Sequence, residues 1–140
     1  MNNLQSICAI GCRTSTLSSL LGKLYELERI NGIDIDNDFL TISQRRGIDA
    51  KKCNINDQHL PYKDETFDVV LFCKVLEHLQ NYHLAMNQIY GIIEKNGTLI
   101  ITTPNVASLR NRITLLFGKD VHNIYSENQK DVHITYSIRR

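Results

Sequence analysis

The feature that most constrains the fold is the segment Phe67–Cys73, which is apolar at almost every position. A strand that is apolar on both faces is typical of a parallel sheet that helices cover on both sides. Helical spacing of apolar residues follows this segment, and Lys95–Gly97 supplies a stop signal for that helix. The apolar positions of the expected helix are Ala85, Met86, Ile89, Ile92 and Ile93.

The same alternation of strand and helix runs along the rest of the chain. The pattern predicts further strands within residues 4–10, 29–34, 48–55 and 98–103, and helices over residues 17–24, 36–46 and 106–117. Leu17, Leu20, Leu21 and Leu24 predict that the first helix is amphipathic. We therefore expect one α/β domain over residues 1–140. It should be a Rossmann-like, doubly wound, mainly parallel sheet of about five strands in the order 3-2-1-4-5, with helices on both faces.

Composition narrows the class of partner. The 16 basic and 15 acidic residues give a net charge of +1, which favours neither nucleic acid nor an anionic membrane. We find no apolar run long enough for a membrane span and no signal peptide, so a cytoplasmic protein is expected. Four cysteines are scattered without a C-x-x-C pair and are interpreted as reduced, buried residues; metal ligation is the alternative, and no metal site is predicted. The four cysteines are Cys8, Cys12, Cys53 and Cys73.

Ligands of such sheets bind beyond the carboxyl ends of the strands. Gly11 follows the first expected strand, where a glycine lets the backbone pass close to a ligand. Asp34 ends the second strand, twenty-three positions later, near the offset at which a carboxylate meets ribose hydroxyls in nucleotide folds. The alternative is an ordinary turn with a solvated aspartate, although Asp36 fits the role of helix cap better.

Several longer segments resemble those of class I S-adenosylmethionine-dependent methyltransferases. The segment after position 102 is similar to a subgroup that acts on small molecules, including sugars and lipid-linked substrates. The resemblance is carried by Gly32–Asp36, Leu60–Val70, Val75–Leu79, Ile92–Ile101 and Thr103–Arg112.

This resemblance implies an enzyme that transfers a methyl group from S-adenosylmethionine to a small-molecule acceptor. Asp34 would hold the ribose and Ile35 would cover the adenine, while positioning would supply most of the catalysis. His78 and His133 are weak candidates for a general base, with a surface histidine as the alternative. The other implied cofactor-binding residues are Gly11 and Cys12 under the methionine, Cys73 and Lys74 at its end, and Asn54, Asn56 and Asp57 near the adenine amino group.

The chain also departs from the family pattern. Ala9 stands where the family usually has an acidic residue, and Arg13 and Ser15 stand where it has glycines, which costs about 1 kcal/mol at a position of positive φ. The usual last two strands are not expected, because residues 131–137 can form at most one strand. The fifth strand would then have an unpaired edge, open to a homodimer or a partner chain.

These departures support a second hypothesis, a catalytically silent relative that acts as an interaction module through its exposed sheet edge. A third hypothesis, a nicotinamide-dependent oxidoreductase, requires G-x-G-x-x-G, of which Gly11–Thr16 has only the first glycine.

Overall fold

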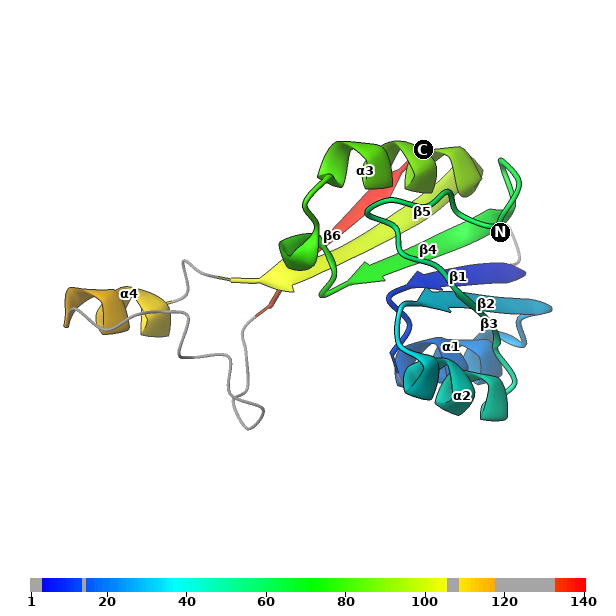
Figure 1. Ribbon diagram of the computed structural model, residues 1–140, viewed down its shortest axis with the longest axis horizontal. Coiled ribbons are helices and arrows are strands. Elements are labelled where there is room, and N and C mark those ends of the chain that lie inside the picture. Colours follow the sequence, from blue (N-terminus) through cyan, green and yellow to red (C-terminus); the bar gives the residue numbers. More distant parts are fainter. Residues whose placement is uncertain (1–3, 14, 106–108, 118–132) are drawn as a thin grey trace.

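The computed structural model describes residues 4–13, 15–105, 109–117 and 133–140. In these residues six strands form one sheet in the order β3-β2-β1-β4-β5-β6 (Figure 1). The first five strands are parallel, which confirms the expected α/β class and the order 3-2-1-4-5. The strands are β1 (Ser6–Ile10), β2 (Arg29–Asp34), β3 (Asp49–Lys52), β4 (Phe67–Cys73), β5 (Ile93–Pro104) and β6 (His133–Arg139).

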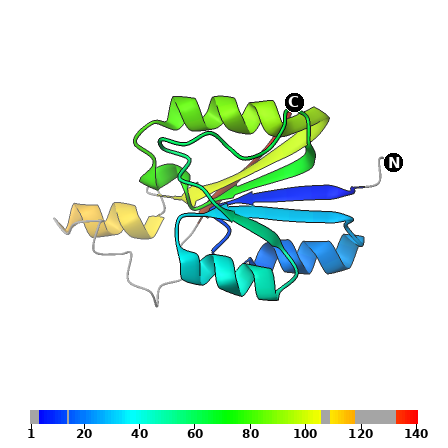
Figure 2. The ribbon, with the colours of Figure 1, turned by 45° about the vertical axis from the view of Figure 1, so that its right-hand side comes forward.

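Helices cover both faces of the sheet. Figure 2 shows α1 (Thr16–Tyr25) and α2 (Asn37–Arg45) on one face and α3 (Tyr82–Ile92) on the other. A single 3-10 turn, η1 (Leu76–His78), links β4 to α3, and α4 (Leu109–Leu116) lies beyond the end of β5 in both views. Within the described ranges, no helix has the length and apolar character needed to cross a membrane.

The two faces of β4 are buried in different cores, as its apolar sequence predicts. Phe67, Val70 and Phe72 pack into the core on the α3 side, whereas Leu71 packs into the core on the side of α1 and α2. This central position carries the carboxyl end of β4 to the edge of the sheet where β1 and β2 also end.

The expectation of an unpaired edge on β5 is wrong. Strand β6 pairs with β5 in antiparallel register from Thr98 opposite Arg139 to Pro104 opposite His133. The predicted single strand within residues 131–137 therefore does form, and its backbone satisfies the hydrogen-bonding groups along that side of β5.

Two predicted boundaries near α3 also differ from the structure. The helix ends at Ile92, before the expected stop signal, because Ile93 is buried opposite Phe67 and already belongs to β5. Lys95–Gly97 instead lies in an irregular part of β5, with Asn96 at φ 69°. Glu77 and His78 belong to η1, and Asn81 caps α3 by accepting a hydrogen bond from the Leu84 backbone N–H at 3.2 Å.

Helix α1 does not direct its whole leucine stripe toward the sheet. Leu17, Leu20 and Leu24 are exposed, whereas the small residues Ser18 and Gly22 are buried. A β-carbon added at Gly22 would lie only 2.0 Å from Cδ1 of Ile30 in β2. The helix thus packs closely on the sheet through its small residues, which the spacing of the leucines did not predict.

Candidate functional site

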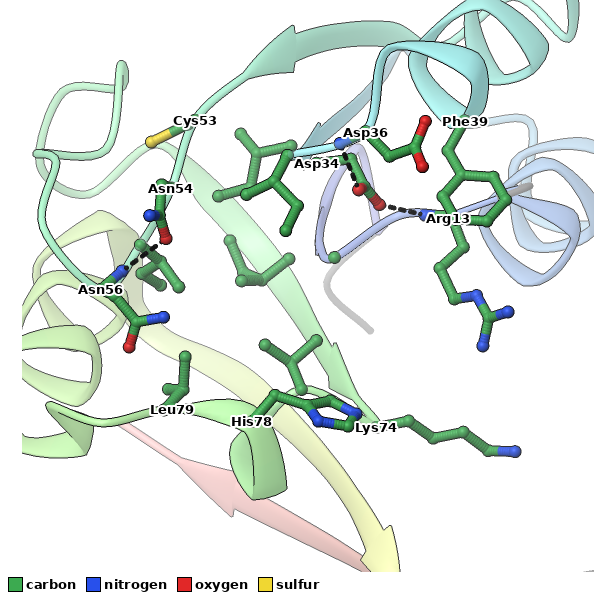
Figure 3. A pocket seen from close by; sticks show the side chains of 16 residues that line it. Arg13, Asp34, Asp36, Phe39, Cys53, Asn54, Asn56, Lys74, His78 and Leu79 are labelled. Carbon is green, nitrogen blue, oxygen red and sulfur yellow. Dashed lines mark hydrogen bonds between the residues drawn. The ribbon is translucent and has the colours of Figure 1, made fainter. Parts of the chain in front are cut away.

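A cavity of about 370 Å³ lies at the carboxyl ends of β1, β2 and β4 (Figure 3). Its volume is within the range typical of small-molecule sites. Six of the predicted cofactor-binding residues line it together: Gly11, Asp34, Ile35, Asn54, Asn56 and Lys74. Strands β1 and β2 thus bring Gly11 and Asp34 to one cavity.

Gly11 forms the floor of this cavity close to a neighbouring side chain. Its φ is +67°, a conformation that side-chain-bearing residues rarely adopt, and an added β-carbon would lie 2.4 Å from Cγ2 of Val75. Both observations require a glycine where the first strand turns toward α1.

Asp34 is buried at the end of β2, and its carboxylate is oriented by the backbone. One oxygen accepts a hydrogen bond from the Arg13 N–H at 2.7 Å and the other from the Asp36 N–H at 3.0 Å (Figure 3). Each carboxylate oxygen has a second acceptor site, so both can also accept from a ligand hydroxyl. The carboxylate is therefore preorganised to hold two neighbouring hydroxyls.

The remaining walls combine apolar side chains with a fixed polar loop. Ile35 lines the cavity and remains 63% exposed, which leaves an apolar surface for a planar ring to cover. On the loop after β3, the Asn54 side chain accepts from the Asn56 N–H at 3.2 Å, and the Asn56 side chain accepts from the Gln80 N–H at 3.0 Å. These bonds hold the loop against the start of α3.

The backbone after Gly11 adopts left-handed conformations at both positions where the family has glycines. Arg13 has φ 44° and Ser15 has φ 53°. Ser43 of α2 supports this strained loop, because its hydroxyl donates to the Arg13 carbonyl at 2.9 Å and lies 2.6 Å from the Ser15 hydroxyl and 3.6 Å from the Cys12 sulfur. Hydrogen bonds of the buried Ser43 hydroxyl thus stabilise backbone conformations at Arg13 and Ser15 that glycine adopts more readily.

The Arg13 side chain lines the cavity beside Phe39. Its guanidinium carbon is 5.4 Å from the centre of the Phe39 ring, a cation–π contact. A second cavity, of about 570 Å³, lies beside the first and shares Ile10, Gly11, Arg13 and Lys74 with it.

The other predicted residues lie at different places. Cys12 and Cys73 line the second cavity, and Asp57 lines a hollow that shares Ile35 and Asn54 with the first cavity. His78 lines the first cavity, whereas the side chain of His133 is outside the described part of the chain. Residue spacing did not reveal Phe39 and Val75, which carry no chemical signature in the sequence.

The cysteine chemistry follows burial. Burial raises the pKa of the Cys8 thiol and, with a further contribution from nearby Asp57, the pKa of Cys53. Burial also raises the pKa of Tyr62, whose hydroxyl donates to the Gly32 carbonyl at 3.2 Å. Among the residues that the structure describes, no group of three or more His, Cys, Asp or Glu side chains is placed to hold a metal ion.

The parallel sheet and the cavity at its strand ends define a Rossmann-like ligand-binding domain. A family model described as "Methyltransferase domain" matches residues 8–101. The chain belongs to this methyltransferase family.

The chain is also similar to individual curated proteins. The chain is 40% identical over 89 residues to an uncharacterized protein of Methanocaldococcus jannaschii, covering 63% of this chain and 39% of that protein. It is 25% identical over 114 residues to demethylmenaquinone methyltransferase of Alkalihalophilus pseudofirmus, covering 71% and 48%. The chain thus spans less than half the length of these curated relatives.

Among solved structures, the fold is similar to that of a methyltransferase from Thermotoga maritima described as a possible histamine N-methyltransferase. The TM-score is 0.66 at 22% identity, with 83% of this chain and 52% of that one covered.

Proposed function

We propose that this domain binds S-adenosylmethionine and serves a methyltransferase that acts on a small molecule. The observation that carries the proposal is the convergence of Gly11 and the preorganised Asp34 carboxylate on one cavity. Two comparisons support this proposal: membership of the methyltransferase family supports methyl transfer, and similarity to a demethylmenaquinone methyltransferase supports a small-molecule acceptor. Among small molecules, we expect a sugar or a lipid-linked acceptor.

The residues of the cavity fit the nucleoside part of this cofactor. Asp34 would accept hydrogen bonds from the two ribose hydroxyls, and exposed Ile35 would cover one face of the adenine. Asn54 and Asn56 would lie near the edge of the adenine ring, on the loop that their own hydrogen bonds hold in place. The bound sulfonium would supply an activated methyl group.

The chain itself would contribute orientation more than acid–base chemistry. Ser43 holds the Arg13 carbonyl, and backbone N–H groups hold the Asp34 carboxylate. These groups would bind a ligand without reorganising, which would lower the entropic part of the barrier. His78 is exposed beside the cavity and would be a candidate to remove a proton from an acceptor that must lose one.

Calorimetric titration with S-adenosylmethionine and S-adenosylhomocysteine tests the proposal directly. We expect wild-type binding in the micromolar range and a loss of affinity of about tenfold or more in Asp34→Ala, because the carboxylate no longer accepts from the ribose. Asp38→Asn changes an exposed carboxylate in the first turn of α2, outside the cavity, and is the matched control.

A second variant separates loss of binding from loss of fold. Ile35→Ser alters an exposed side chain and should retain the wild-type melting temperature while weakening the binding of adenosine-containing ligands. No heat with either ligand at millimolar concentration would favour the catalytically silent alternative. Unchanged affinity in both Asp34→Ala and Ile35→Ser would show that the nucleoside binds elsewhere.

A further inference from the structure

The second cavity shares Gly11 with the first cavity, but Asp34 does not line it. The end of β1, the start of α1 and the end of β4 form it, and its lining includes Ala9, Thr16, Cys73 and Thr102. It shares Gly11, Arg13 and Lys74 with the first cavity. A ligand whose nucleoside occupies the first cavity would therefore extend its tail across Gly11 into the second.

The charges around this second cavity have one sign. Among the described residues that line it, Arg13 and Lys74 are the charged ones, and both are cations. Ala9 occupies the wall at the end of β1 and offers no carboxylate. Figure 3 shows Arg13 and Lys74 on the opposite side of the pocket from Asn54 and Asn56.

Helix α1 adds to the same field. It begins at Thr16, which lines the cavity, and the N-cap residue Ser15 makes no side-chain hydrogen bond to the helix. The amino end of a helix carries a partial positive charge that favours anions nearby. Two cations and a helix N-terminus thus act together at one end of the site.

We propose that this cavity recognises the tail of the cofactor through its carboxylate and not through its ammonium group. The inference rests on the proposed function, because the nucleoside at Asp34 determines where the tail lies. The chemical class that the site should select is an adenosine thioether or sulfonium with an anionic tail. A tail that carries only an ammonium group meets Arg13 and Lys74 without a partner of opposite charge.

Four uncharged-sulfur ligands isolate the contribution of the tail. S-adenosylhomocysteine carries both groups, 4-(adenosylthio)butanoate only the carboxylate, S-adenosyl-3-thiopropylamine only the ammonium, and 5′-methylthioadenosine neither. Calorimetry should show that the affinity of the carboxylate ligand is within about threefold of that of S-adenosylhomocysteine. It should also be roughly tenfold higher than the affinity of the amine ligand, because each of the two exposed cations adds a small favourable interaction with the carboxylate. The amine ligand should bind no tighter than 5′-methylthioadenosine, and the preference should fall as salt rises.

Variants assign the preference to the two cations. Arg13→Gln and Lys74→Gln together should bring the carboxylate and amine ligands to within about threefold of each other. Lys74→Glu should reverse the order of the two ligands, and because Lys74 is exposed the variant should retain its melting temperature. Lys23→Gln, an exposed cation at the end of α1 outside both cavities, should leave the preference unchanged.

The outcomes separate this inference from the proposed function. Equal affinity for all four ligands, or tighter binding of the amine than of the carboxylate, would overturn the inference while the nucleoside pocket stands. Failure of all four ligands to bind would overturn both.

Discussion

Gly11 and Val75 are in such close contact that a β-carbon on the glycine would lie 2.4 Å from Cγ2 of the valine. The contact joins the turn after β1 to the second residue beyond the end of β4, so it sets the floor of the first cavity. The positive φ of Gly11 and this contact are two separate reasons for glycine, and variants can separate them.

Gly11→Ala should destabilise the domain by about 2 kcal/mol or more, because the left-handed conformation and the clash with Val75 both disfavour alanine. Gly11→Ala combined with Val75→Ala removes the clash and should recover part of that loss. Chemical denaturation measures both effects. The effect of Val75→Ala alone on the unfolding free energy is first subtracted from that of the double variant. If the double variant is then no more stable than Gly11→Ala, the contact does not constrain the turn.

Arg13 is held at φ 44°, which predicts an inverted order of stability for its small variants. Arg13→Gly should be about 1 kcal/mol more stable than Arg13→Ala, because both lose the contact with Phe39 and only glycine adopts the left-handed region freely. Arg45, in the last turn of α2, is the control, where alanine should be more stable than glycine. The same order at both positions would contradict the strained loop.

Ser43 should stabilise the turn after β1 from a distance in sequence. Ser43→Ala removes a fully buried hydroxyl that donates to the Arg13 carbonyl and contacts Ser15, so we expect a loss of about 1–3 kcal/mol in unfolding free energy. Affinity for adenosine ligands should fall as well, because the Arg13 N–H also orients Asp34. Thr41→Ala, an exposed hydroxyl on the same helix, should change neither quantity appreciably.

Asp68 should make stability depend on acid pH. Burial raises the pKa of its carboxyl. Hydrogen bonds from the Ser6 side chain and from the backbone N–H groups of Gln5 and Ser6, together with the charge of Arg29, lower this pKa by more. The net pKa is therefore below its ordinary value. A lowered pKa in the folded state stabilises the protein above the unfolded pKa of about 3.9, and this contribution is lost as pH falls through the folded value.

We therefore expect Asp68→Asn to be clearly less stable than wild type at pH 7, with the difference shrinking below about pH 4. Denaturant unfolding across this range measures the difference, with Glu28→Gln, an exposed carboxyl, as control. A difference that stays constant from pH 7 to pH 3 would contradict the role assigned to the ionised carboxylate.

Much of the fold could be predicted because its signals are local and periodic. The continuous apolar character of Phe67–Cys73 predicts a strand buried on both faces, and the structure places it at the centre of the sheet. The alternation of strands and helices predicted the order of the parallel strands, since right-handed crossovers leave few alternatives. The position of Asp34 at a strand end likewise followed from spacing alone.

Only the tertiary structure decided which side chains complete the site. Val75 against Gly11, Phe39 under Arg13 and Ser43 beneath the turn are contacts across 26 to 64 positions of sequence, and none of these residue types signals its role. The exposed leucines of α1 and the pairing of β6 with β5 were decided in the same way. Periodicity determines which elements form, whereas close packing determines which of their surfaces meet, and that depends on the shapes of both partners.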